Sequence, residues 1–330
     1  MADPQVPEES VGRTALRLVR PDPGTLRAAA FLVAVVLVPG FIAQAIGGLN
    51  ASVTVGLCSG AAMSFGTLMR ARTAALVTLA LGAAAAAGAL VAGQPWLSGL
   101  AVALAILLTA PANAYSAGML MMAPILTMVF AVTERGWPWW RAGLWGVIGG
   151  LVGLAIALLM RFGQRPPQPV DRALAWRHAI VLAVAAGLSI VAAELLDLDH
   201  GYWVTVTLLV VLRPVPGERR DYVRQRLAGT LLGAAVALVV VWLLPANLLL
   251  PAAFVFLVVL ASYAMSGNYF MQTLFLTPML LIFLSADGSG EVTVDLTVTR
   301  VAFTVVGVIL AAGLAWALER WDERSGLVTA

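Results

Sequence analysis

Hydrophobic residues occur along this chain in long, nearly unbroken stretches, and polar residues are confined to short segments between them. A helix rises about 1.5 Å per residue, so roughly 20 apolar residues cross the hydrocarbon layer of a bilayer. The pattern therefore predicts an all-α, polytopic membrane protein with about twelve transmembrane helices. Their expected ranges are 27–47, 51–69, 74–93, 97–111, 114–132, 141–160, 176–196, 202–212, 226–244, 248–265, 268–285 and 300–318.

The composition supports a membrane protein and narrows the chemistry. Of the 330 residues, 61% are hydrophobic and 11% charged, whereas a soluble domain carries roughly 45–50% apolar and about 25% charged residues. All 20 basic residues are Arg, so no Lys is present for a nucleotide-binding P-loop or a Schiff base. The single Cys58 excludes an internal disulfide and a multi-cysteine metal site. We expect no enzymatic activity, no cofactor, no metal site and no nucleic-acid partner.

The arginines predict the orientation, because cytoplasmic loops of membrane proteins are enriched in basic residues. With a cytoplasmic N-terminus and alternating spans, 17 arginines fall inside and 3 outside. Both termini are therefore expected on the cytoplasmic side of the inner membrane, and no removable signal peptide is expected. The inner arginines are Arg13, Arg17, Arg20, Arg27, Arg70, Arg72, Arg161, Arg165, Arg172, Arg177, Arg213, Arg219, Arg220, Arg224, Arg226, Arg320 and Arg324, and the outer ones are Arg135, Arg141 and Arg300.

The two halves of the chain resemble each other. Arg141 and Arg161 frame the sixth apolar stretch, and Arg300 and Arg320 frame the twelfth with the same spacing of 20 residues. Further matching pairs are Arg27 with Arg177, and Arg72 with Arg226. Two parallel six-helix repeats explain this pattern, although apolar helices rich in Ala, Leu and Val also resemble one another without a repeat. The expected organisation is a cytoplasmic segment 1–26, repeats 27–165 and 166–320, and a cytoplasmic tail 321–330.

The eighth stretch is too short to cross a bilayer. It spans 201–212, about 18 Å of helix, and then meets Arg213 and Pro214. At an offset of 150 residues the first half has Met63 within a continuous apolar stretch. Arg213 either extends to the lipid headgroups or faces an aqueous cavity beside a broken helix, where it would attract an anion. The following basic residues either contact lipid phosphates or concentrate cytoplasmic anions as a funnel; they are Arg219, Arg220, Arg224 and Arg226.

Residues around this interruption resemble the signature of the fusaric-acid-resistance-like (FUSC) membrane proteins. The matching motif is Tyr202-Trp203, Thr207, Pro214, a basic stretch, and then Arg226, Gly229, Thr230 and Gly233. The family includes bacterial aromatic-acid exporters and, more distantly, plant malate channels. The first half lacks the Tyr-Trp and Gly-Thr pairs, and we expect none of the large cytosolic domains of many exporters of this family. The resemblance implies transport of organic anions, with Arg226 and Thr230 holding the basic loop against the ninth helix.

Polar residues elsewhere give weaker candidates. Asn268, Tyr269 and Gln272 either line a pathway for an aromatic anion or form helix–helix hydrogen bonds. His178 and His200 are expected at the membrane surfaces, where solvated histidines are common, although either could bind a proton. Glycine pairs four residues apart are expected to let helices pack closely. These pairs are Gly56 with Gly60, Gly146 with Gly150, Gly149 with Gly153, and Gly229 with Gly233.

The sequence therefore favours a transporter, driven by an ion gradient, that exports small organic or aromatic carboxylic acids. Arg213 would bind the carboxylate, and Tyr202, Trp203 and Thr207 would line the route with Asn268, Tyr269 and Gln272. A passive anion channel and a non-transporting membrane scaffold are the alternatives. The expected partners are membrane lipids and a small organic anion, and the sequence leaves open whether the chain forms a homodimer.

Overall fold

A computed structural model describes residues 16, 18–68, 71–116, 121–133, 137–159, 169–215, 218–284 and 290–324. Over these residues the chain forms thirteen helices and no strand. The helices are α1 (Pro23–Gly47), α2 (Leu49–Leu68), α3 (Ala71–Val91), α4 (Pro95–Leu108), α5 (Ala110–Tyr115), α6 (Met122–Thr133), α7 (Trp139–Leu159), α8 (Arg172–Leu195), α9 (Tyr202–Val211), α10 (Glu218–Leu243), α11 (Ala246–Ser266), α12 (Tyr269–Leu284) and α13 (Gly290–Arg324). The positions of Arg13, Arg17, Arg70, Arg135, Arg161 and Arg165 lie outside the described residues.

Eight helical segments are long and apolar enough to cross a membrane. They are α1, α3, the continuous run α4–α5, α7, α8, α10, α11 and α13. Shorter apolar segments lie within α2, α6, α9 and α12. The predicted all-helical, multi-pass membrane fold is therefore confirmed, whereas the twelve spans, the two repeats and the four-part organisation of the chain stay predictions.

Small residues allow the helices of the first half to approach closely. A Cβ atom added to Gly153 of α7 would lie 2.2 Å from the Ser59 carbonyl oxygen of α2. On the same helix, Gly146 faces the backbone of Gly82 in α3. Without side chains at these positions, α7 can pack against both α2 and α3. The predicted close packing is confirmed here, with Gly149 and Gly150 behaving alike, but it is wrong for Gly56 and Gly60, which have no neighbour within 4 Å of an added Cβ.

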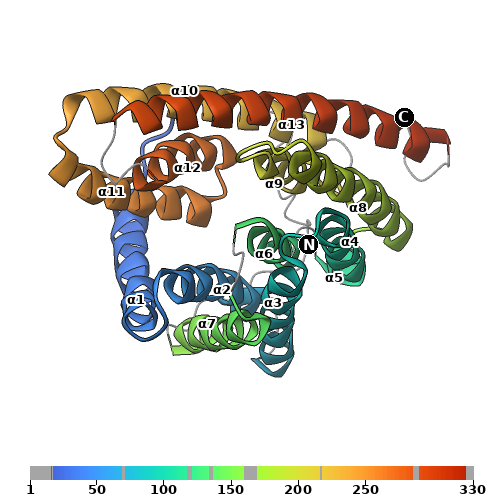
Figure 1. The fold of residues 1–330 in the computed structure, drawn as a ribbon, viewed down its shortest axis with the longest axis horizontal. Coiled ribbons are helices and arrows are strands. Elements are labelled where there is room, and N and C mark those ends of the chain that lie inside the picture. The colour runs from blue at the N-terminus through green and yellow to red at the C-terminus, as the bar shows by residue number, and fades with distance from the viewer. Residues whose placement is uncertain are drawn as a thin grey trace, which may run out of the picture.

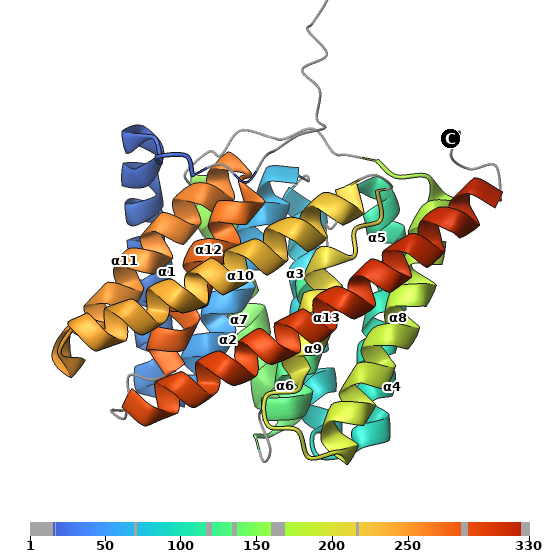
Figure 2. The same ribbon diagram turned by 90° about the horizontal axis from the view of Figure 1, so that it is seen from above.

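The second half is dominated by two long helices. Helices α10 and α13 run beside each other along one side of the molecule, with α12 packed on α10 and α9 packed on α13 (Figures 1 and 2). Gly229 and Gly233 face the backbone of α12, so their predicted packing role is confirmed. Gly307 similarly faces Thr207 of α9. The short helix α9 is thus held against the middle of α13.

The two halves meet mainly through two helix pairs. Helix α1 packs against α11, and α4 packs against α8 (Figure 1). The largest apolar cluster lies at the second of these contacts and includes Val102 and Ile106 of α4, Ala186 of α8 and Leu208 of α9. The interrupted helix is therefore packed into the contact region between the halves.

Two predicted element boundaries are wrong. The residues after 218 were expected to form a basic loop, but they belong to α10 because the break ends before them. Arg, Gln, Leu and Ala, which are common there, favour helix. Helix α13 was expected from 300 and instead begins at Gly290 and continues to Arg324, a length of 35 residues. Arg300 consequently lies inside a helix and not on an outer connecting segment.

Candidate functional site

Helix α9 ends part-way along the helices that surround it. It has 10 residues, about 15 Å of helix, and Leu212 after it is extended, with φ −78° and ψ 95°. Pro214 has no backbone N–H, and it disfavours a helical conformation for Arg213 before it. The predicted interruption is therefore confirmed, and its local cause is the Arg213-Pro214 pair.

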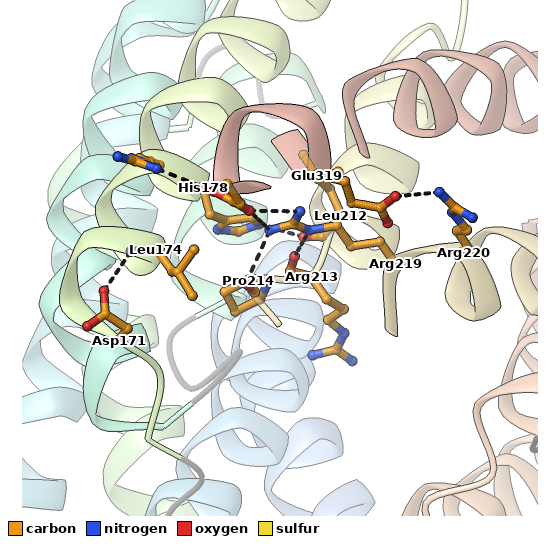
Figure 3. Close-up of polar contacts among 11 residues, drawn as sticks. Asp171, Leu174, His178, Leu212, Arg213, Pro214, Arg219, Arg220 and Glu319 are labelled. Atoms are coloured by element: carbon orange, nitrogen blue, oxygen red, sulfur yellow. Dashed lines mark hydrogen bonds and ion pairs between the residues drawn. The ribbon is translucent and has the colours of Figure 1, made fainter. Parts of the chain in front are cut away.

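Arg219 donates hydrogen bonds to carbonyl groups that the interruption leaves without helical partners. Its Nε donates to the Arg213 carbonyl oxygen at 2.9 Å, and its Nη2 donates to the Pro214 carbonyl oxygen at 3.3 Å (Figure 3). Its Nη1 lies 3.3 Å from Oδ2 of Asp322 in α13, and Arg177 of α8 lies 3.7 Å from the other carboxylate oxygen. Arg219 is only 1% exposed. It stabilises the break and is not a surface member of the predicted funnel.

The remaining funnel residues differ from one another. Arg220 is exposed and pairs with Glu319 at 2.7 Å, and Arg224 is exposed on the same helix. Arg226 was expected beside them and is instead 1% exposed. Only the first two can therefore meet anions at the surface, and Arg226 belongs to the interior.

His178 contacts the interruption from α8. Its Nε2 lies 2.6 Å from the Leu212 carbonyl oxygen, and the residue is 3% exposed (Figure 3). The expectation of a solvated surface histidine is wrong because α8 carries this side chain into its contact with α9. The other histidine, His200, lies at the opposite end of α9, beside a hollow of about 370 Å³ lined also by Glu194, Asp197 and Asp199.

The Arg213 guanidinium has no carboxylate partner among the described residues. Its guanidinium lies 4.4 Å from the centre of the Tyr222 ring, which is 4.5 Å from the ring of Tyr269. In Figure 3 the Arg213 side chain points away from the guanidinium of Arg219. Its Nε is buried and has no hydrogen-bond partner. Arg213 thus stacks on the Tyr222 ring with its Nε donor unused.

Two further arginines are more deeply buried and equally unpaired. Arg226 of α10 is 1% exposed and Arg300 of α13 is 2% exposed. No partner is present for Nε and Nη2 of Arg226, or for any of the three guanidinium nitrogens of Arg300. The Arg300 guanidinium lies 3.8 Å from the centre of the Trp203 ring in α9. The sequence assigned Arg300 to the outer surface, and its position within a long apolar helix is the signal that was missed.

The three unpaired arginines form a row beside α9. Trp203 precedes Arg213 by ten residues, about 15 Å along a helical path. Arg226 is an electrostatic neighbour both of Arg300 and of Tyr269, and Arg213 is a neighbour of Tyr269 as well. The order is therefore Arg300, Arg226 and Arg213, which we call the arginine row.

The other predicted site residues have different roles. Tyr202 is half-buried next to Trp203 and is an electrostatic neighbour of Arg300. Thr207 donates to the Trp203 carbonyl oxygen of its own helix at 2.9 Å. Thr230 is buried one turn after Arg226, and its hydroxyl has no partner.

Asn268 and Gln272 make contacts typical of a helix–helix turn. The Asn268 side chain accepts from the Met271 backbone N–H at 3.1 Å, and Gln272 donates to the Tyr263 carbonyl oxygen at 3.2 Å. Of the polar group predicted on this helix, only Tyr269 lies beside the arginine row.

Comparison with known proteins places this site inside a recognised region. Residues 188–318, which include the whole arginine row, match the family described as fusaric acid resistance protein-like. The second half carries a fusaric acid resistance protein-like domain. The family resemblance inferred from the motif is therefore confirmed. No solved structure matches the chain significantly.

Several curated proteins are similar to about half of the chain. The inner membrane protein YccS of Escherichia coli K12 is 27% identical over 154 residues, which are 46% of this chain and 21% of that protein. An uncharacterized protein of Haemophilus influenzae is 28% identical over 169 residues, covering 51% and 22% of the two chains. An uncharacterized protein of Neisseria gonorrhoeae is 31% identical over 142 residues, 43% and 33%. The chain thus matches about a fifth of the length of the first two.

Proposed function

We propose that this fusaric acid resistance protein-like chain transports small organic or aromatic carboxylates across the inner membrane. The arginine row carries the proposal: three cations beside an interrupted helix have no carboxylate partner among the described residues. Isolated charges are costly in a membrane interior and usually serve a function there. A bound carboxylate offsets this cost, because a guanidinium can donate two parallel hydrogen bonds to it.

The aromatic residues fit the same ligand. Trp203 and Tyr222 each already have a guanidinium over one face, which keeps the arginines oriented while leaving their N–H groups free. Tyr202 and Tyr269 add ring surface on either side of the row. A small acid with an apolar body could therefore contact both kinds of group along the row.

The packing of the two halves supports the predicted repeat. Helix α7 packs on α2 and α3, as α13 packs on α9 and α10. Helix α6 packs on α3, as α12 packs on α10, and the pair α1–α11 between the halves matches the pair α8–α4. In transporters built from repeats, the substrate site commonly lies near the repeat interface beside interrupted helices, which is where α9 is found.

The arginine distribution supports cytoplasmic termini, and similarity to the Escherichia coli inner membrane protein YccS supports the inner membrane assignment. An ion gradient is the proposed energy source. A passive anion channel is the alternative, since the same row would serve both. Planar-bilayer currents that follow the anion gradient alone, at channel rates, would favour the channel.

Flux of labelled 4-hydroxybenzoate in liposomes that contain the full chain tests the proposal. We expect flux well above that of protein-free liposomes, and a loss of about 10–100-fold in Arg226→Gln, since one charge-assisted hydrogen bond contributes about 1.5–3 kcal/mol. Arg72→Gln is the matched control, because Arg72 is the predicted first-half counterpart and is exposed. Equal flux with and without protein would contradict transport, and equal flux in wild type and Arg226→Gln would remove the arginine row from it.

A further inference from the structure

The Leu212 carbonyl oxygen beside the His178 imidazole determines which ring nitrogen carries a hydrogen. A carbonyl oxygen can only accept, so the 2.6 Å contact with Leu212 requires a hydrogen on Nε2. In a neutral ring Nδ1 is then an unprotonated acceptor. This Nδ1 is buried and has no partner.

A second buried acceptor without a partner lines the same cavity as His178. Asn113 of α5 is 7% exposed, and its Oδ1 is buried without a partner. Asn113 and His178 line the same cavity, of about 20 Å³, together with Thr109 and Pro214. One water molecule needs roughly 10–15 Å³, so the two side chains can meet directly or through a single water.

One added proton satisfies both unpartnered atoms. An imidazolium has N–H donors on both sides: Nε2 would keep its bond to Leu212, and Nδ1 would donate toward Asn113. We propose that His178, in the cavity that it shares with Asn113, is the proton-binding site of the transport cycle, and that its protonation is linked to anion binding on the arginine row. The proton comes from bulk water and forms only the Nδ1–H bond. The linkage rests on the proposed function, whereas the proton site does not.

The charges around His178 explain the linkage. On α8 itself, Arg177 pairs with Asp322 of α13, and Asp322 also pairs with Arg219 of α10. Arg213 has no such partner, and both Arg213 and Arg219 are electrostatic neighbours of the ring. Helices α4, α5, α6 and α9 contribute no charged residue. An anion on Arg213 therefore removes the main uncompensated repulsion on an added proton, and the effect is reciprocal.

Asn113 and His178 lie at a contact between the two halves, where a transporter is expected to move. Asn113 belongs to the first half and His178 to the second, and α5 packs on α8. Leu212 is the first residue after α9, where the interruption begins. A movement of one half against the other would change the Asn113–His178 contact, so that proton affinity would depend on which side the arginine row faces.

Calorimetry with benzenesulfonate tests the linkage, because this anion stays ionised throughout the useful pH range and takes up no proton itself. Titrations of the purified full chain in two buffers with different ionisation enthalpies give the number of protons bound per anion. We expect uptake close to one proton in wild type and in His200→Gln, and close to zero in His178→Gln. The chain has only two histidines, so His200→Gln is a matched control. Unchanged uptake in His178→Gln would overturn the proposal.

A second measurement does not depend on anion binding or on the fold of a variant. In wild-type protein labelled with ¹⁵N-histidine, two residues give signals, and ring nitrogen shifts report protonation directly. We expect one histidine to be a neutral Nε2–H tautomer that takes up a proton reversibly as pH falls, at higher pH when benzenesulfonate is bound. A ring that stays neutral until the protein unfolds, with and without the anion, would overturn the proton site. Titration without any anion binding would retain that site and reject the proposed function instead.

Two substitutions of Asn113 test whether it is the partner of the proton on His178 Nδ1. Asn113→Asp adds a negative charge opposite Nδ1 and should move the His178 titration to higher pH, whereas Asn113→Leu removes the acceptor and should move it lower. A titration that is the same in both variants would show that Asn113 does not face the proton.

Discussion

The pairs α2–α7 and α9–α13 correspond in the proposed repeat, but they are built differently. Helix α2 continues for 20 residues and carries buried Met63 at the position that matches Arg213. Helix α9 stops after 10 residues. Arg141 is exposed near the start of α7, whereas its predicted counterpart Arg300 is 2% exposed inside α13. In the first half, α2 is continuous and packs closely on α7 through small residues. In the second half, α9 is interrupted and lies beside arginines without partners.

Buried arginines are of two kinds in this molecule, with and without partners for the guanidinium. Arg219 is buried with a full set of partners, namely two backbone carbonyls and Asp322. Arg226 and Arg300 are equally buried without such partners. The first kind stabilises the interruption, and the second is the proposed ligand site. Stability and transport should therefore respond in opposite ways to the loss of each.

The largest effect is expected from Arg219→Met. Breaking a buried ion pair leaves the remaining charge uncompensated and costs about 3–5 kcal/mol, and here the carbonyls at the interruption lose their donor as well. We expect a large drop in the thermal unfolding midpoint of the purified protein in detergent. Arg72→Met, at an exposed first-half position, is the control. A midpoint equal to that of wild type would show that the break needs no such support.

Arg300→Met should separate function from stability. Removing an unpaired buried charge in favour of an apolar side chain of similar volume is expected to leave stability unchanged or raise it. Flux of 4-hydroxybenzoate should fall about 10–100-fold, the value of one charge-assisted hydrogen bond. Flux and thermal unfolding are measured on the same preparations. Loss of stability together with full flux would reverse the distinction drawn between the two kinds of arginine.

The sequence predicted the interruption well, because proline and a charge after a short apolar stretch act locally. The Arg213-Pro214 pair and the 10-residue helix follow from covalent geometry and composition alone. The burial of Arg300, Arg226 and His178 could not be predicted in this way. Each depends on which neighbour a long helix meets, such as Trp203 against Arg300, and that is a tertiary property.

The positive-inside rule led to a wrong location for one residue of the site. It treats every arginine as a loop residue, and it therefore assigned Arg300 to the surface although α13 continues for ten residues before it. An arginine inside a long apolar stretch with no acidic residue one turn away is a better signal of a ligand site than its place in a charge count.

Glycine substitutions compare the packing of α7 and α13, which correspond in the proposed repeat. Gly153→Ala would bring a methyl group to 2.2 Å from the Ser59 carbonyl oxygen, and such overpacking costs about 1–3 kcal/mol. Gly313→Ala in α13 meets nothing within 4 Å and should stabilise its helix by about 0.5–1 kcal/mol. Thermal unfolding should thus shift down for the first and slightly up for the second. Equal shifts would mean that α7 does not depend on close approach.

The smallest effect is expected from the outermost pair between α10 and α13. Arg220 and Glu319 lie 2.7 Å apart, one residue along from Arg219, but the arginine side chain is 68% exposed. Exposed ion pairs contribute about 0.2–1 kcal/mol and weaken with salt. A double-mutant cycle with Arg220→Met and Glu319→Gln should therefore give a small coupling energy that falls with ionic strength. The equivalent cycle with Arg219→Met and Asp322→Asn should give a larger coupling that salt hardly changes, because the two pairs join the same helices and differ mainly in burial. Similar coupling energies for the two pairs would show that burial does not strengthen the Arg219–Asp322 pair.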